Sequence, residues 1–151
     1  MENVQNPDEK GIELGDGYSV WGSEDNGRFA KFTLADLRRQ LTLWGKKPDI
    51  IHWNNGLWDT AFSEEGSVFT TPEEYRRDMA AILRELKKIT PHIIFATTTP
   101  VKAENHNHNN ETIAAYNRIA LSVIEGQGVA VNDLNALVGS HMSEYICEDT
   151  V

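Results

Sequence analysis

The stretch Asp49-Ile50-Ile51-His52-Trp53-Asn54-Asn55-Gly56-Leu57-Trp58-Asp59-Thr60 begins as a strand and ends as a polar loop. Three of its first five residues, Ile50, Ile51 and Trp53, are apolar and two of these are β-branched, which is typical of a buried strand in a parallel sheet. Two asparagines and a glycine then end the strand at its carboxyl side. Ligands of open α/β sheets bind just outside the carboxyl ends of the strands. The loop therefore lies where a binding site is expected, although Asn, Gly and Asp are also common in ordinary turns.

Composition and charge narrow the class of protein. The chain has 151 residues, 40% hydrophobic and 25% charged, which fits one globular domain. A net charge of −9 disfavours nucleic acid as a partner. No apolar run approaches the length of a membrane span and no apolar segment follows Met1, so we expect neither membrane association nor an export signal. Cys147 is the single cysteine, and we expect a cytoplasmic protein without a disulfide, a metal or another cofactor.

Strand and helix patterns alternate along most of the chain. Residues 1–16 are polar and broken by glycine and proline, so we expect an irregular lead-in, followed by one domain over residues 17–151. Short apolar runs predict strands at 18–21, 49–53, 92–96 and 129–131. Periodic apolar stripes predict helices from Thr33 to the glycine at 45, from Pro72 to before Pro91, over 111–125, and over 133–138. This alternation indicates an α/β fold with a parallel sheet and helices on both faces.

The second helix has the clearest start signal. Thr71 is the expected N-cap, Pro72 occupies the first helical position, and Glu74 completes a capping box. The stripe predicted to face the core consists of Tyr75, Met79, Ile82, Leu83 and Leu86. The polar loop over 61–70, between the central stretch and this helix, is expected to form a rim over the site.

Several chemistries are disfavoured by the sequence. The segment 15–17 reads Gly-Asp-Gly and precedes a strand, so it is no dinucleotide-binding turn, and no Gly-Lys-Ser/Thr phosphate loop occurs. His106 and His108 lie in an Asn-rich loop, where solvated histidines are a better interpretation than a metal site. His52 is interpreted as a packing residue within a strand. His141 has no neighbour in sequence that marks it as a base.

A series of segments, taken in their order along the chain, resembles the sequence of an SGNH (GDSL-type) hydrolase. They cover residues 18–22, 24–29, 49–60, 95–101, 116–117, 131–134 and 147–151. The resemblance implies a three-layer α/β/α fold with a flavodoxin-like parallel sheet. It also implies hydrolysis of esters or acetyl groups by a serine nucleophile, with backbone and asparagine oxyanion donors and an Asp-x-x-His pair. A small ester or an acylated carbohydrate is the implied ligand.

The family's functional residues carry over incompletely. The Gly-Asp-Ser nucleophile turn is absent, and the segment at 15–17 has glycine in place of the serine. Gly27 matches the backbone donor, and Gly56 is a further candidate for the oxyanion hole. At the family's Gly-x-Asn-Asp block the chain has Gly56-Leu57-Trp58-Asp59, so Asn55 or Asn54 is left to supply the oxyanion amide. Asp149 matches the catalytic aspartate, and the sequence ends before the matching histidine.

The resemblance therefore predicts the walls of a hydrolase site without its nucleophile and base. We expect a serine esterase or carbohydrate deacylase domain that is truncated and inactive as this chain. The alternative is a non-catalytic module that binds a sugar or an acyl group through the 54–59 loop, with Asn54, Trp58 and Asp59 as contacts. The strand order expected for this fold type is 2-1-3-4-5. The predicted strands of this chain match the second to the fifth, so we expect the first, central strand to be missing. We expect a gap beside residues 49–53, a displaced 18–21 strand, or self-association through the incomplete sheet.

Overall fold

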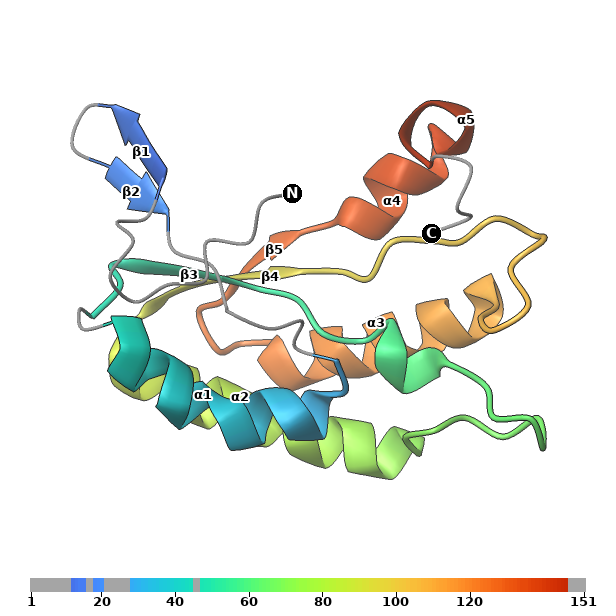
Figure 1. Cartoon of the computed structure of the whole chain (residues 1–151), viewed down its shortest axis with the longest axis horizontal. Helices are drawn as coiled ribbons and strands as arrows, with labels where there is room; N and C mark the ends of the chain where they lie inside the picture. Colours follow the sequence, from blue (N-terminus) through green and yellow to red (C-terminus); the bar gives the residue numbers. More distant parts are fainter. Residues whose placement is uncertain (1–11, 16–17, 21–27, 45–46, 147–151) are drawn as a thin grey trace.

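The computed structural model describes residues 12–15, 18–20, 28–44 and 47–146 (Figure 1). No helix in these ranges is both long enough and apolar enough to cross a bilayer. The elements, in chain order, are β1 Ile12–Gly15, β2 Tyr18–Val20, α1 Ala30–Trp44, β3 Ile50–Trp53, η1 Trp58–Thr60, α2 Pro72–Ile89, β4 His92–Ala96, α3 Asn110–Ile124, β5 Ala130–Asn132, α4 Leu134–Gly139 and α5 Met142–Tyr145.

The central sheet is parallel and has the order β3-β4-β5. Ile50 is opposite His92 and Trp53 is opposite Phe95, while Ala96 is opposite Asn132. The predicted ladder through residues 49–53, 92–96 and 129–131 is thus confirmed, with the last strand displaced by one residue. All three strands end at the same edge, which brings their exit loops together.

The amino-terminal strands form a separate hairpin. β1 and β2 pair antiparallel in a sheet of their own. The prediction that residues 1–16 contain no strand was wrong, because Ile12–Gly15 pairs with the strand that follows it. A local hairpin closes a short loop at small entropic cost, so even a brief apolar run forms a strand there. The predicted strand at 18–21 does form, but it is displaced from the main sheet, one of the three expected outcomes.

The first long helix begins earlier than predicted. α1 starts at Ala30 rather than after Thr33. The backbone N–H of Ala30 donates to the carboxylate of Asp59, which lies 29 residues further along the chain. A cap from so distant a residue leaves no local signal in the sequence. The helix ends at Trp44, before the glycine at 45, as expected.

The helices α2, α3 and α4 start close to their predicted positions. Thr71 and Glu74 form the capping box of α2 in both directions, with Pro72 in the first turn. The side chain of Asn109 caps α3, and that of Asp133 caps α4. The predicted capping box of α2 is confirmed, and the predicted starts of α3 and α4 are confirmed within a residue.

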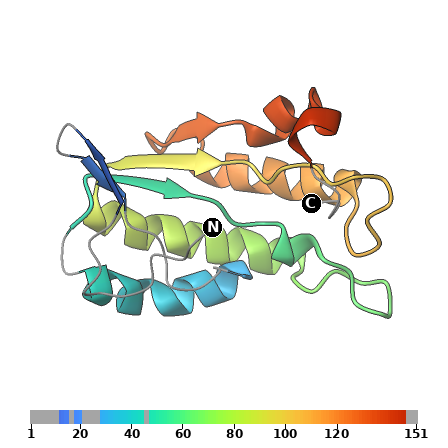
Figure 2. The ribbon, with the colours of Figure 1, turned by 45° about the horizontal axis from the view of Figure 1, so that its top comes forward.

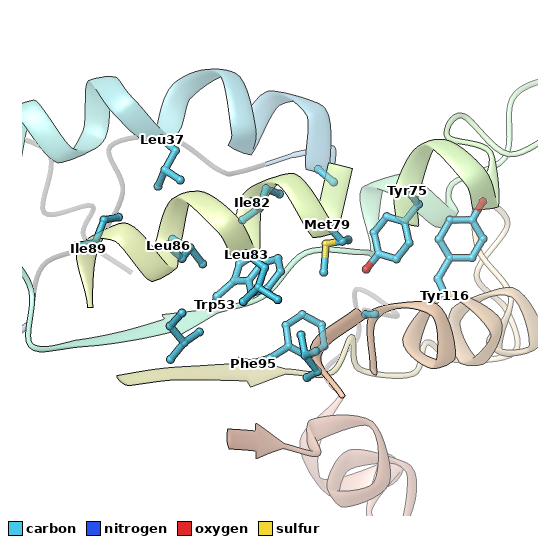
Figure 3. Packing of buried hydrophobic residues seen from close by; sticks show 14 residues of the cluster. Leu37, Trp53, Tyr75, Met79, Ile82, Leu83, Leu86, Ile89, Phe95 and Tyr116 are labelled. Atoms are coloured by element: carbon cyan, nitrogen blue, oxygen red, sulfur yellow. The ribbon is translucent and has the colours of Figure 1, made fainter. Parts of the chain in front are cut away.

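The core lies between the sheet and the three long helices, which cover the same face of the sheet (Figures 1 and 2). The predicted stripe of α2 is buried, and it packs beside Trp53 and Phe95 of the sheet (Figure 3). The rings of Trp53 and Phe95 meet edge to face at 5.1 Å. This packing fixes β3 and β4 rigidly behind their exit loops.

The opposite face of the sheet is uncovered in the described part of the chain. Ile51 and Trp53 of β3 point toward the helices, whereas Ile50 is 61% exposed and His52 is exposed. The α/β class and the parallel sheet are confirmed, and the missing first strand agrees with a sheet of three strands. The expectation that residues 49–53 are buried on both faces was wrong, because α1, α2 and α3 all pack on one side.

Candidate functional site

Asn54 marks the carboxyl edge of the sheet. Its side-chain Nδ2 donates to the carbonyl oxygen of Ala96 at 2.7 Å, although the residue is exposed. The next backbone N–H along, that of Thr97, donates to Asn132 at 3.1 Å. These contacts join the ends of the three parallel strands. An amide nitrogen carries two hydrogens, so Asn54 keeps a second donor for a ligand at this edge.

Asn55 faces the interior instead. It is 4% exposed, and its Oδ1 accepts from the indole nitrogen of Trp53 at 2.7 Å. Its Nδ2 donates to Thr33 at 2.9 Å and approaches the carbonyl of Arg28 at 3.5 Å. Asn54 is thus exposed at the edge of the sheet, whereas Asn55 holds the loop in place; which of the two supplies an oxyanion amide stays a prediction.

Gly56 follows in a conformation and an environment that favour glycine. Its φ is +149°, and a Cβ placed there would come within 2.4 Å of the hydroxyl oxygen of Thr98. The backbone carbonyl of Asn55 accepts from Tyr75 at 2.8 Å and from Thr98 at 3.4 Å. Burial raises the pKa of Tyr75 well above its usual value, so its hydroxyl remains a donor. The loop is thus pinned from α2 and from the exit of β4.

Asp59 is fully buried under the loop. Both of its carboxylate oxygens lie within hydrogen-bonding distance of the Ala30 nitrogen, at 3.1 and 3.2 Å. Burial raises the pKa of Asp59 to about 6; the hydrogen bond from Ala30 opposes this rise, and the charge of Asp78 adds to it. A side chain without exposed surface supports the site from beneath and does not reach a ligand in this arrangement.

Trp58 lies on the outside of the same turn and is 44% exposed. Its ring packs edge to face with the ring of Phe29, with 5.6 Å between the ring centroids. The centroid of Phe29 also lies 5.7 Å from that of Phe32 and 5.8 Å from that of Phe69. We call Phe29, Phe32, Trp58 and Phe69 the aromatic cluster. The Lys31 ammonium lies over the rings of Phe29 and Phe32, at 5.4 and 5.3 Å. Exposed aromatic surface of this kind is a common place for ligands.

The two loops beyond the strands are tied to each other. The N–H of Phe62 donates to the carbonyl of Asn107 at 2.9 Å, and Thr60 Oγ1 lies 3.3 Å from His108 Nδ1. Burial lowers the pKa of His108. Figure 1 shows both loops beyond the carboxyl end of the sheet. The expectation that the 61–70 loop covers the site stays a prediction.

The remaining histidines do not assemble a metal or catalytic centre. His52 is exposed, with Nε2 3.4 Å from Asn132 Nδ2, so its interpretation as a packing residue was wrong. His141 Nδ1 lies 2.8 Å from Ser140 Oγ, but both atoms also approach the Leu137 carbonyl and so end α4. Among the described residues, no group of three or more His, Cys, Asp or Glu side chains is placed to hold a metal ion.

Two predicted site residues, Gly27 and Asp149, lie outside the described residues. The roles of Gly27 as a backbone donor and of Asp149 as the catalytic aspartate therefore stay predictions. Sequence analysis also missed two supports of the loop, Tyr75 and Thr98, whose hydroxyls hold the Asn55 carbonyl. A tyrosine within a buried apolar stripe is itself a signal, since its hydroxyl needs a buried partner.

Comparison with solved structures supports this arrangement. No family model and no curated protein matches the sequence. A lipase/acylhydrolase from Enterococcus faecalis superimposes with a TM-score of 0.72 at 16% identity, over 88% of this chain and 67% of that one. The acetylxylan esterase Axe2 from Geobacillus stearothermophilus gives 0.67 at 18% identity, over 88% of this chain and 63% of that one.

The chain has the SGNH hydrolase fold. A third similar structure, the α/β hydrolase LAE5 from the Lake Arreo metagenome, gives a TM-score of 0.67 at 15% identity over 88% of this chain and 63% of that one. The predicted resemblance is thus confirmed at the level of the fold. The matches cover 63–67% of the length of these enzymes.

Proposed function

We propose that this chain is part of an SGNH-type ester hydrolase domain and supplies the substrate-facing amide of its site. The observation that carries the proposal is Asn54, an exposed amide fixed by Ala96 at the carboxyl edge of a parallel sheet. Preorganised amide donors at such a place stabilise the oxyanion formed in acyl transfer. The matched fold supports the same assignment.

The chain alone is proposed to be inactive. Its sequence contains no Gly-Asp-Ser turn and no histidine after Asp149. Without a serine no acyl-enzyme forms, and without a histidine no base activates another nucleophile. Asp149 remains the proposed catalytic aspartate and Gly27 the proposed backbone donor. Reading the coding DNA on both sides of this frame would show whether the missing blocks flank it.

The ligand is proposed to be a small acylated carbohydrate. The aromatic cluster offers an exposed indole at Trp58, and the apolar face of a sugar ring stacks on such a surface. The structural similarity to acetylxylan esterases supports an acetylated sugar as the substrate class. In this arrangement Trp58 holds the ring and Asn54 faces the acyl oxygen.

The proposal is tested by NMR titration with acetylated xylobiose. We expect chemical-shift changes at the Asn54 side-chain amide and the Trp58 indole, and weaker changes with unacetylated xylobiose. Asn54→Ala should remove the preference for the acetylated sugar. Asn107→Ala, an exposed asparagine in the 102–109 loop, is the matched control and should retain it. Equal binding of both sugars by the unchanged chain and by Asn54→Ala would contradict the role of Asn54 and favour a simple sugar-binding module.

A further inference from the structure

Asp59 connects two parts of the chain that lie far apart in sequence. Its carboxylate accepts the first backbone N–H of α1, from Ala30, while the adjacent Trp58 contacts Phe29. Asn55, four positions before Asp59, reaches Thr33 and the carbonyl of Arg28. The β3 exit loop therefore holds the segment 28–33 at several points. We call Asn55 and Asp59 the clamp.

The segment that the clamp holds is strained. Arg28 has φ = +49°, and it is the one non-glycine residue with positive φ among those that the structure describes. The left-handed region is unfavourable for a residue with a Cβ, and it persists where its surroundings impose it. Here the side-chain amide of Asn55 approaches the carbonyl oxygen of Arg28, and the carboxylate of Asp59 accepts a hydrogen bond from the backbone N–H of Ala30. Backbone strain of this kind is often found at functional sites, where it fixes the position of neighbouring groups.

We propose that Asp59 is a positioning residue, which holds the start of α1 against the β3 exit loop and so fixes the wall of the site formed by residues 28–30 and the aromatic cluster. The proposal rests on the proposed function only in that this wall belongs to that site. Asp59 itself touches no ligand, because it has no exposed surface. It acts through the Ala30 N–H and through the contact of Trp58 with Phe29.

The ionisation of Asp59 matters for this role. A carboxylate is a stronger acceptor than a neutral carboxyl, and negative charge at a helix N-terminus is favourable. Protonation should therefore weaken the hold on Ala30. The other titratable groups that face Asp59 are Asp78 and Tyr75 from α2 and Tyr116 from α3. The buried pKa of Asp59, about 6, places this change within reach of a mild titration.

The experiment follows the Ala30 backbone amide by NMR between pH 4.5 and pH 8. In the unchanged chain we expect its proton to move upfield as pH falls, with a midpoint near that of Asp59, and its hydrogen-exchange protection to fall several-fold. Asp59→Asn should remove the transition and hold the amide near its low-pH position. Glu64→Gln makes the same change of charge on an exposed loop and should leave the transition intact.

A second control separates a nearby histidine from the clamp. His108 lies against Thr60, the residue after Asp59, and burial lowers the pKa of its imidazole. His108→Gln should leave the Ala30 transition unchanged. An Ala30 amide that stays constant over the whole pH range in the unchanged chain, or a transition that persists in Asp59→Asn, overturns the proposal. The titration of the unchanged chain decides the matter even if the variant does not fold.

The readout also distinguishes this proposal from the proposed function. Titration of Ala30 together with absence of sugar binding would leave the clamp in place and remove the hydrolase-site assignment. Sugar binding together with an Ala30 amide insensitive to pH would do the reverse. A coupled result is expected: Asp59→Asn should weaken binding of acetylated xylobiose about 3- to 10-fold, as misplacement of a wall does without loss of a direct contact.

Discussion

The side-chain amide of Asn54 lies 2.7 Å from the carbonyl oxygen of Ala96, so an exposed residue joins the carboxyl ends of β3 and β4. The neighbouring Asn55 turns inward and is almost fully buried. Of these two adjacent asparagines, Asn54 is therefore exposed to solvent at the edge of the sheet, and Asn55 stabilises the loop from the interior.

This difference in burial predicts unequal effects of two alanine substitutions on the free energy of unfolding. Asn55→Ala leaves the buried Trp53 indole nitrogen and the Thr33 hydroxyl without this partner, and we expect a loss of about 2–3 kcal/mol in the free energy of unfolding. Asn54→Ala is exposed and should change it by less than about 0.5 kcal/mol. Urea unfolding measures both. Equal losses would contradict the assignment.

Gly56 should tolerate no side chain. Gly56→Ala places a Cβ against Thr98 and adopts a φ of +149°, and together these should cost about 2–5 kcal/mol. Gly66→Ala is the matched control, because Gly66 has φ = +80° but no atom within 4 Å of the added carbon. It should cost only about 1–2 kcal/mol. If the two variants unfold at the same denaturant concentration, the close approach to Thr98 is unimportant.

Asp59 predicts a pH dependence of stability with a definite sign. Its pKa is raised from 3.8 to about 6 by burial, so the folded protein holds this proton more tightly than the unfolded chain. The contribution to stability is full below pH 4 and is lost as pH rises through 6. Asp59→Asn should therefore gain about 3 kcal/mol relative to the unchanged chain between pH 4 and pH 8. Parallel stability curves for the two proteins would refute the raised pKa.

The uncovered sheet face predicts association. Ile50 is 61% exposed on an edge strand of the described sheet, and exposed strand edges pair with other chains. We expect the chain to bind a hydrophobic dye and to self-associate at micromolar concentration. Ile50→Lys should reduce both, whereas Leu137→Lys, which removes a 49% exposed leucine from α4, should not. Light scattering would measure the association and fluorescence the binding of the dye. A chain that is monomeric and binds no dye would count against an incomplete sheet.

Features set by neighbours in sequence were predictable, and those set by distant partners were not. The capping box at Thr71 and the strand ends at 53 and 96 follow from local chemistry, and both were confirmed. The start of α1 was misplaced because its cap is Asp59, and His52 was misjudged because the cover of a sheet face depends on the whole topology. The inward turn of Asn55 likewise depends on Thr33 and Trp53, which no local pattern connects.

We propose that this chain forms the walls of an SGNH hydrolase site without the groups that break the ester bond. The most direct measurement is the hydrolysis of p-nitrophenyl acetate by the purified 151-residue chain. We predict no saturable turnover above that of Asn54→Ala or of buffer. Saturable turnover that a serine-directed phosphonate abolishes would contradict this proposal, because it would reveal a serine nucleophile within the chain.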